Sequence, residues 1–265
     1  MANTHPANLG DVLKHLVLCE ALAATPNTYI ESHAGAYSYD LGTVADPGLG
    51  GIWDFAQVAA ADPVLAESAY ARIALPLAGT VENPGTYLGS VGLAHELLPL
   101  DAAITAAEAN PDTADALGTA LGASGRHVQI MGPPFEGQDV VARTAGPGTL
   151  VLIDPFDVHE KSLMGTSSID AFCRAAQQGA ATYLWYPLVE PDQGTPWVHE
   201  VLAPAGIQPV QLEIRYPEKA AGLWGCGLVA AQIQPKAYLR TVGLWSSLRH
   251  GLRITGARYE FHTMG

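Results

Sequence analysis

The feature that most constrains this chain is the apolar run from Thr149 to Ile153 (TLVLI), which is followed directly by Asp154 and Pro155. A strand that is apolar on both faces must be covered on both sides. This is typical of a parallel sheet enclosed between two layers of helices. The run therefore predicts a buried parallel strand with a carboxylate at its carboxyl end.

Further strands and helices alternate along the chain. The predicted strands are 27–33, 127–131, 149–153, 181–188, 208–215 and 223–231, and the predicted helices are 11–24, 110–122 and 167–178. This alternation predicts a parallel, doubly wound α/β sheet. The last two strands lack a helix between them, so we expect them to pair antiparallel at the edge of the sheet. Residues 102–109 fit either a helix or a strand, because Ala is a poor strand former.

The length of 265 residues fits one large domain or two small ones, and a single α/β sheet accommodates it. Residues 44–79 are rich in Ala and Pro and are predicted to be largely helical. We interpret residues 43–82 as a helical insertion or lid after the first strand, within one domain.

Charge and cysteine content exclude several classes of protein. The chain has 13 basic and 26 acidic residues, a net charge of −13, which disfavours broad electrostatic binding of nucleic acid. Five basic residues near the end predict a solvated helix rather than a phosphate site. They are Lys236, Arg240, Arg249, Arg253 and Arg258.

Three distant cysteines form no disulfide framework, and nine scattered histidines predict no metal site. We find no signal-peptide pattern and no membrane-spanning run, so we expect a protein of the reducing cytoplasm.

In an open α/β sheet, ligands bind beyond the carboxyl ends of the strands, so the polar residues there are the candidate site. His33 follows the first predicted strand. Glu108 could accept hydrogen bonds from a ribose diol, or it could be an exposed helical residue. Asp154 is either a helix cap or an active-site group. Trp185 and Tyr186 could stack on a base, face a cation or simply pack in the core.

Several segments, in order along the chain, resemble one family. They are the stretch from His5 to His15 (HPANLGDVLKH), Ser32–Ala36, Pro84–Thr86, Glu108–Pro111, Ile153–Pro155 and Leu184–Pro187. Together they resemble the RlmJ family, bacterial enzymes that use S-adenosylmethionine (SAM) to methylate an adenine N6 in large-subunit ribosomal RNA.

The resemblance implies a class I methyltransferase sheet with a small helical insertion, and a strand at 102–109. It implies a cofactor turn containing Gly35. It also implies SAM contacts at Lys14, His33, Thr86, Glu108 and Asp154. In that arrangement Lys14 and His33 lie near the methionine end of SAM, and Glu108 holds the ribose.

The chain departs from the family where the acceptor base would bind. The family's amino-methylating motif is Asp or Asn, Pro, Pro, then Tyr or Phe. Here Phe156 replaces the second Pro and Asp157 replaces the stacking aromatic residue. Pro133 stands where an acid would hold the adenine amine of SAM. These departures favour retained SAM binding over methylation of RNA adenine.

The leading hypothesis is therefore a SAM-dependent enzyme that acts on a small molecule, most simply by methyl transfer. Asp154, Asp157 or His15 could remove the proton of the acceptor, and Tyr186 could face the sulfonium. An alternative consumes SAM itself, with Lys14 and His15 at the aminobutyrate arm, and releases 5′-methylthioadenosine. Two further alternatives are a ribosomal RNA adenine-N6 methyltransferase and a non-catalytic SAM-binding protein.

Overall fold

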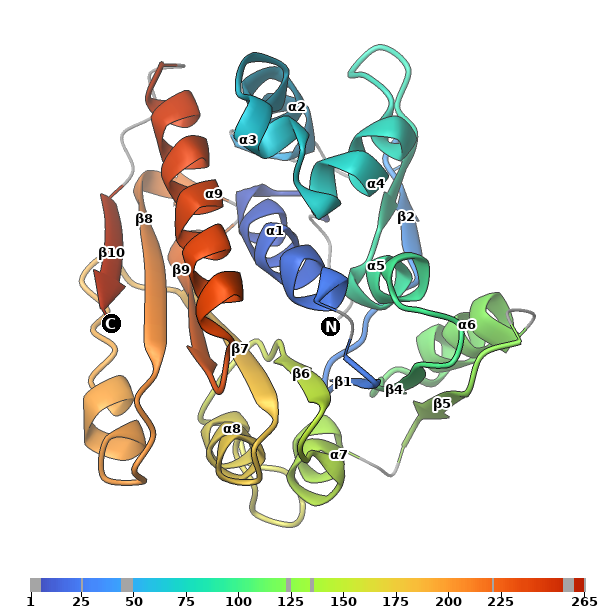
Figure 1. The fold of residues 1–265 in the computed structure, drawn as a ribbon, viewed down its shortest axis with the longest axis vertical. Helices are drawn as coiled ribbons and strands as arrows, with labels where there is room; N and C mark the ends of the chain where they lie inside the picture. The colour runs from blue at the N-terminus through green and yellow to red at the C-terminus, as the bar shows by residue number, and fades with distance from the viewer. Residues whose placement is uncertain are drawn as a thin grey trace.

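A computed structural model describes residues 6–24, 26–43, 50–122, 125–133, 136–220, 222–254 and 260–264. The chain forms a mixed α/β fold around an eight-stranded sheet, with a separate two-stranded sheet beside it (Figure 1). The predicted alternation of strands and helices is therefore correct.

Five parallel strands form the larger part of the main sheet. They are β1 (Thr28–Glu31), β4 (Ala103–Ala107), β5 (Val128–Met131), β6 (Thr149–Ile153) and β7 (Ala181–Leu188). Their order across the sheet is β5-β4-β1-β6-β7. This is the 3-2-1-4-5 order of doubly wound nucleotide-binding sheets, in which ligands bind where the order reverses, beside the first strand. All five residues of β6 are buried, as the apolar run predicts.

The remaining strands are β8 (Val210–Ala220), β9 (Leu223–Ala231) and β10 (Glu260–Met264). β8 and β9 pair antiparallel, as predicted. They are not the edge, however: β9 lies between β7 and β8, and β10 pairs with the outer side of β8.

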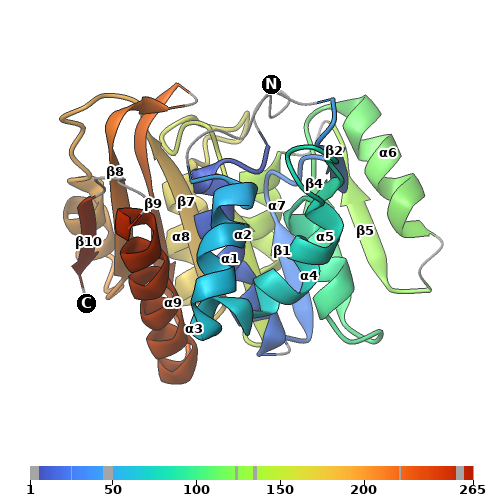
Figure 2. The same cartoon turned by 90° about the horizontal axis from the view of Figure 1, so that it is seen from above.

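Helices cover both faces of the sheet (Figure 2). One face carries α1 (Leu9–Ala23), α5 (Ser90–Leu97), α6 (Pro111–Gly122) and α9 (Pro235–Ile254), and the other carries α7 (Gly137–Thr144), α8 (Ser168–Gln177) and the short π-helix η1 (Val198–Leu202). Two hydrophobic clusters, one on each face, follow from this arrangement.

The predicted helical insertion contains α2 (Ile52–Ala61), α3 (Pro63–Ala66) and α4 (Ala69–Ala78). It is flanked by β2 (Ser38–Asp40) and β3 (Thr86–Leu88), which form the two-stranded sheet. These helices contact α1 and α9. The segment therefore forms an outer layer over α1.

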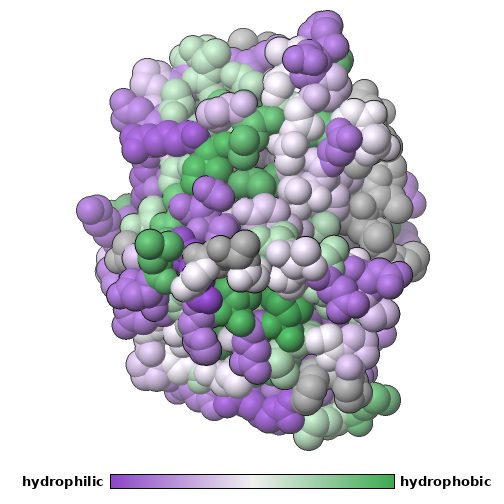
Figure 3. Space-filling view, turned by 90° about the vertical axis from the view of Figure 1, so that its right-hand side faces the viewer, coloured by the Kyte–Doolittle hydropathy of each residue, from purple (hydrophilic) through white to green (hydrophobic). Residues whose placement is uncertain are grey.

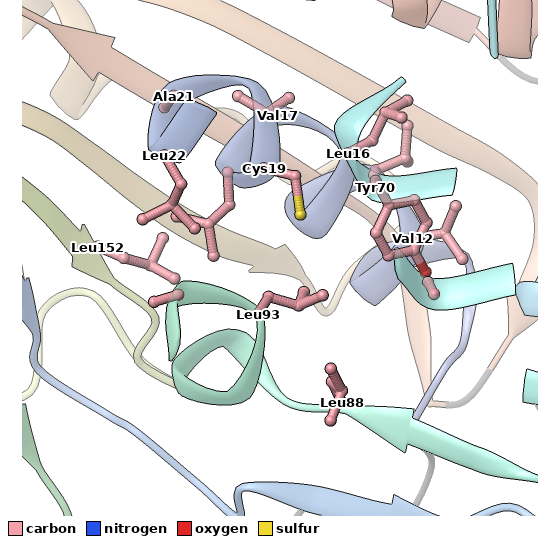
Figure 4. Packing of buried hydrophobic residues seen from close by; sticks show 14 of the residues in the cluster. Val12, Leu16, Val17, Cys19, Ala21, Leu22, Tyr70, Leu88, Leu93 and Leu152 are labelled. Atoms are coloured by element: carbon pink, nitrogen blue, oxygen red, sulfur yellow. The ribbon is translucent and has the colours of Figure 1, made fainter. Parts of the chain in front are cut away.

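α1 lies at the centre of the larger cluster, where its apolar side chains meet α4, α5 and β6 (Figure 4). Thirteen of its fifteen residues are buried, because it is covered by the sheet on one side and the insertion on the other. Asn8, not Asp11, caps this helix: the Asn8 side chain accepts a hydrogen bond from the Asp11 backbone N–H at 3.1 Å. Asp11 lies in the first turn.

Among the described residues, no helix has the length and apolar character needed to cross a bilayer. No cluster of three or more metal-ligating side chains occurs in the described part of the chain either. The expected C-terminal helix is α9, which contacts α1, α2 and α3. Arg258 of its basic cluster lies outside the described residues, as do His5, Pro134 and Phe135.

Candidate functional site

The carboxyl ends of β1, β4 and β6 bring together several of the predicted site residues. Lys14 projects from α1 to the end of β6, where its ammonium donates to Asp154 Oδ2 at 2.6 Å. The same ammonium donates to Asp11 Oδ1 at 3.0 Å, one turn earlier on the helix. Lys14 is therefore a buried residue at the carboxyl ends of the strands, the edge of the sheet where the candidate site was predicted.

The Lys14 side chain is only 8% exposed, and that of Asp154 is 20% exposed. Burial by itself would lower the pKa of Lys14, but the carboxylates of Asp154 and Asp11 outweigh burial and hold the pKa above its ordinary value. Lys14 is therefore a permanent cation. Its ammonium also lies 5.9 Å from the centre of the Trp185 ring, within the range of a cation–π contact.

The start of α1 is shaped to hold this lysine in place. Asp11 is fixed from both sides, since its Oδ2 accepts from the Ala7 backbone N–H at 3.0 Å while its Oδ1 accepts from Lys14. Gly10 lets the helix approach β7 closely. A Cβ at this position would lie 3.1 Å from the Trp185 ring and 2.9 Å from Asn8 Oδ1. A larger residue there would push α1, and Lys14 with it, away from the sheet.

Glu108 ties the turn after β4 to the turn after β1. Its two carboxylate oxygens accept from the backbone N–H groups of Gly35 at 2.8 Å and Asn110 at 2.7 Å. Gly35 has a φ of 63°, a left-handed conformation that favours glycine. The family resemblance implies that Gly35 and Glu108 contact the same cofactor. In the structure the two residues are hydrogen-bonded to each other.

His33 lies in the turn after β1, partly buried. Its Nδ1 is 2.6 Å from the Ser32 hydroxyl. Burial lowers the pKa of His33, while the negative charges of Asp154 and Glu108 oppose that shift. His33 is therefore a neutral imidazole at pH 7, between the two acidic groups that the sequence places at this edge.

Glu31 is a buried acid that sequence reasoning missed, because it reads as one more residue of the predicted strand. It ends β1, is fully buried, and accepts hydrogen bonds from Tyr29 at 2.7 Å and from Ser90. Burial raises its pKa to about 8, although these two hydrogen bonds oppose the shift. The available signal was an acid inside an otherwise apolar strand, directly before the turn that carries His33.

Two predicted catalytic residues lie away from this cluster. His15 is 2% exposed on α1, and its Nδ1 lies 2.8 Å from the hydroxyl of Tyr87, on which the ring also stacks. Burial and the neighbouring Lys14 lower its pKa to about 3. Tyr186 points to the face of the sheet that carries α8, whereas its neighbour Trp185 points to α1. Successive strand residues point to opposite faces, so only Trp185 reaches Lys14.

The other predicted positions lie on exposed segments. Asp157 is exposed, and its Oδ1 accepts from the His159 backbone N–H at 2.8 Å, which forms a local turn beyond β6. Thr86 is exposed at the start of β3, opposite Asp40 of β2. Pro133 is exposed at the end of the segment that follows β5.

Comparison with known proteins defines the class of fold. No protein-family model matches the chain, and no curated protein sequence matches it. Among solved structures, the protein LPL1258 of Legionella pneumophila, described under the family model DUF519, is similar over 98% of both chains at 20% identity, with a TM-score of 0.78.

Two methyltransferase structures show a more distant likeness. The O-methyltransferase TomG of Streptomyces achromogenes, in complex with SAM, matches over 84% of this chain and 79% of its own at 14% identity, with a TM-score of 0.42. A Bacillus cereus O-methyltransferase in complex with S-adenosylhomocysteine (SAH) matches over 86% and 84% at 11% identity, with a TM-score of 0.43. The strand order and the antiparallel β9 confirm the predicted Rossmann-like α/β class of the sheet.

Proposed function

We propose that this protein binds SAM at the carboxyl ends of β1, β4 and β6 and transfers its methyl group to a small molecule. The observation that carries the proposal is the Lys14–Asp154 ion pair at the end of β6, with Glu108 at the end of β4 and His33, on which both carboxylates act, at the end of β1 between them. This cluster sets one ammonium against three carboxylates, those of Asp11, Asp154 and Glu108. A net negative site suits a ligand with a sulfonium and an α-ammonium, and repels phosphate groups.

Glu108 supports the nucleoside part of the proposal. An acid at the end of the second strand of such a sheet accepts hydrogen bonds from ribose hydroxyls. Each carboxylate oxygen of Glu108 already accepts one backbone N–H, and each has a second lone pair for a hydroxyl donor. The backbone contacts therefore orient the carboxylate and leave lone pairs that can accept hydrogen bonds from a ligand.

The RlmJ resemblance supports a second candidate, methylation of adenine N6 in ribosomal RNA. In its favour is the motif from His5 to His15, whose Asn8, Asp11 and Lys14 are all engaged at the start of α1. Against it stand the net charge of −13 and Phe156 in place of the second Pro. Genuine RNA binding would weaken steeply as salt increases, which a filter-binding titration with ribosomal RNA measures directly.

The primary experiment is calorimetric titration of the protein with SAM, followed by mass spectrometry of the small molecules after incubation with SAM alone. We expect saturable binding that Glu108→Gln weakens at least about tenfold, because hydrogen bonds to a charged carboxylate are lost. Glu82→Gln, at an exposed loop residue, is the matched control.

The incubation separates the remaining alternatives. Intact bound SAM supports the need for an acceptor, whereas 5′-methylthioadenosine formed at an enzymatic rate shows that SAM itself is the substrate. Failure to bind SAM refutes the proposal.

A further inference from the structure

Methyl transfer to a hydroxyl group requires a proton acceptor, because the oxygen must lose its proton as the new bond forms. Few groups in the candidate site can accept a proton at neutral pH. Lys14 is a permanent cation, since two carboxylates surround it. Asp11 and Asp154 are engaged in ion pairs with that lysine.

The other carboxyl groups at this edge are also committed. Glu108 accepts two backbone N–H groups, and its remaining lone pairs are assigned to the ribose hydroxyls in the proposed function. Glu31 is fully buried and bonded to Tyr29 and Ser90, and its raised pKa keeps it protonated at neutral pH. Asp157 is exposed and caps its own turn.

His33 is the neutral group that remains. Its Nδ1 lies 2.6 Å from the Ser32 hydroxyl, and its Nε2 makes no hydrogen bond with any part of the chain that the structure describes. When Nδ1 donates to Ser32, Nε2 carries the lone pair. The charged groups that act on the ring are Asp154 at the end of β6 and Glu108 after β4. Both would stabilise the imidazolium that forms when His33 takes a proton.

We propose that His33 Nε2 is the proton acceptor for a hydroxyl-bearing small molecule in the transfer step. The inference rests on the proposed function. The acceptor oxygen forms a bond to the methyl carbon and the bond from that carbon to sulfur breaks, leaving a neutral thioether. The acceptor's proton moves to Nε2. The positive charge of the sulfonium is therefore replaced by that of the His33 imidazolium. Asp154 and Glu108 face a positive charge both before and after the reaction.

The test compares two methyl acceptors, one with a proton to lose and one without. Catechol carries hydroxyl groups, whereas iodide is a nucleophile that has no proton. Methylated products of both are measured with SAM in the full-length protein, its His33→Gln variant and the control His127→Asn, which changes an exposed residue before β5. Circular dichroism and thermal denaturation show whether each variant is folded, and SAH affinity, measured by calorimetry, shows whether it still binds the cofactor.

We expect His33→Gln to lower the ratio of the catechol rate to the iodide rate by about 100-fold, a typical contribution of general base catalysis. The wild-type catechol rate should rise with pH through a midpoint below the ordinary pKa of histidine and then level off, because His33 loses its proton over that range. In the variant the rate should rise without levelling off, following the ionisation of catechol itself.

Three outcomes would overturn the inference. An equal fall in both rates would make His33 a positioning residue for the cofactor. Unchanged rates with both acceptors would show that another group takes the proton, and methylation of iodide without catechol would show that the site does not accept hydroxyl groups. Binding of SAM without transfer to either acceptor would instead refute the proposed methyl transfer, and the role of His33 with it.

Discussion

Lys14 is a buried charge whose partners replace the water that it has lost. Two carboxylates accept from its ammonium, and an indole ring lies beside it. Removing one member of such a group is costly, because the charges that stay behind remain buried without compensation.

We predict that Lys14→Met destabilises the protein by about 3 kcal/mol, since it leaves Asp11 and Asp154 facing each other without their shared cation. The free energy of unfolding in urea measures the effect. Lys236→Met, at an exposed residue near the start of α9, should change stability by less than about 0.5 kcal/mol. A loss in Lys14→Met no larger than in this control would contradict the prediction.

Glu31 predicts an unusual dependence of stability on pH. Its pKa is raised to about 8 by burial, well above that of an unfolded glutamate. The folded state therefore holds a proton that the unfolded state has lost. The stability due to this proton is fully present below the unfolded pKa and is lost as pH rises toward 8, by up to about 1.4 kcal/mol per pH unit.

Replacing Glu31 with Gln should remove this part of the pH dependence. We expect the free energy of unfolding of Glu31→Gln to fall less steeply than that of the wild type between about pH 5 and about pH 8. Urea denaturation at several pH values gives both slopes, and Glu82→Gln should keep the wild-type slope. Identical slopes for wild type and Glu31→Gln would show that Glu31 is ionised when folded.

At the scale of the elements, β9 needs a residue without a side chain at the point where a side chain of β7 crosses it. Tyr186 of β7 donates to Glu213 Oε2 of β8 at 3.0 Å, although β9 lies between these two strands. The ring passes over Gly227, where a Cβ would lie 2.0 Å from the ring carbon that bears the hydroxyl. A glycine is thus required at position 227, because any side chain there would overlap the Tyr186 ring that reaches Glu213.

We predict that Gly227→Ala destabilises the protein by about 3 kcal/mol, because the added methyl group overlaps the Tyr186 ring. In the double variant Gly227→Ala with Tyr186→Ala, the two losses should not add, since the clash has been removed. Gly118→Ala is the control, because it adds a methyl group inside α6 where the nearest atom is 3.9 Å away, and it should be neutral or stabilising. Additive losses would exclude the clash as the cause.

The sequence was sufficient to predict the elements that depend on a local pattern. The run from Thr149 to Ile153 identified a doubly buried strand, and the strand ends located His33, Glu108 and Asp154. What could not be predicted depends on distant partners. Nothing in the local sequence shows that Tyr87 engages His15, or that Tyr186 and not Trp185 is turned toward α8.

At the scale of the whole molecule, the distribution of charge decides which ligands can approach the site. The chain has a net charge of −13, and the side of the molecule at β5 and α6 shows apolar residues in small patches separated by polar ones (Figure 3). Polyanions are therefore opposed both by the molecule as a whole and by the carboxylates at the candidate site.

We predict that SAM at about 100 times its Kd raises the free energy of unfolding by about 2.7 kcal/mol, since it binds only the folded chain. ATP at the same concentration should leave stability unchanged, because its phosphates meet three carboxylates and a lysine that is already paired. Thermal or urea denaturation with each ligand provides the measurement. Equal stabilisation by ATP would show that the site accepts nucleotides in general.

The Lys14–Asp154 contact joins residues 140 positions apart. During synthesis α1 emerges long before β6, and at ordinary elongation rates it waits roughly 7 to 28 seconds for its partner. In that interval a helix with thirteen residues that are buried in the folded protein lacks the completed sheet, and Lys14 has Asp11 but not Asp154 as a partner. The Lys14–Asp154 ion pair thus forms late in synthesis, when the fourth parallel strand emerges and the 140 positions between the two residues close into a loop.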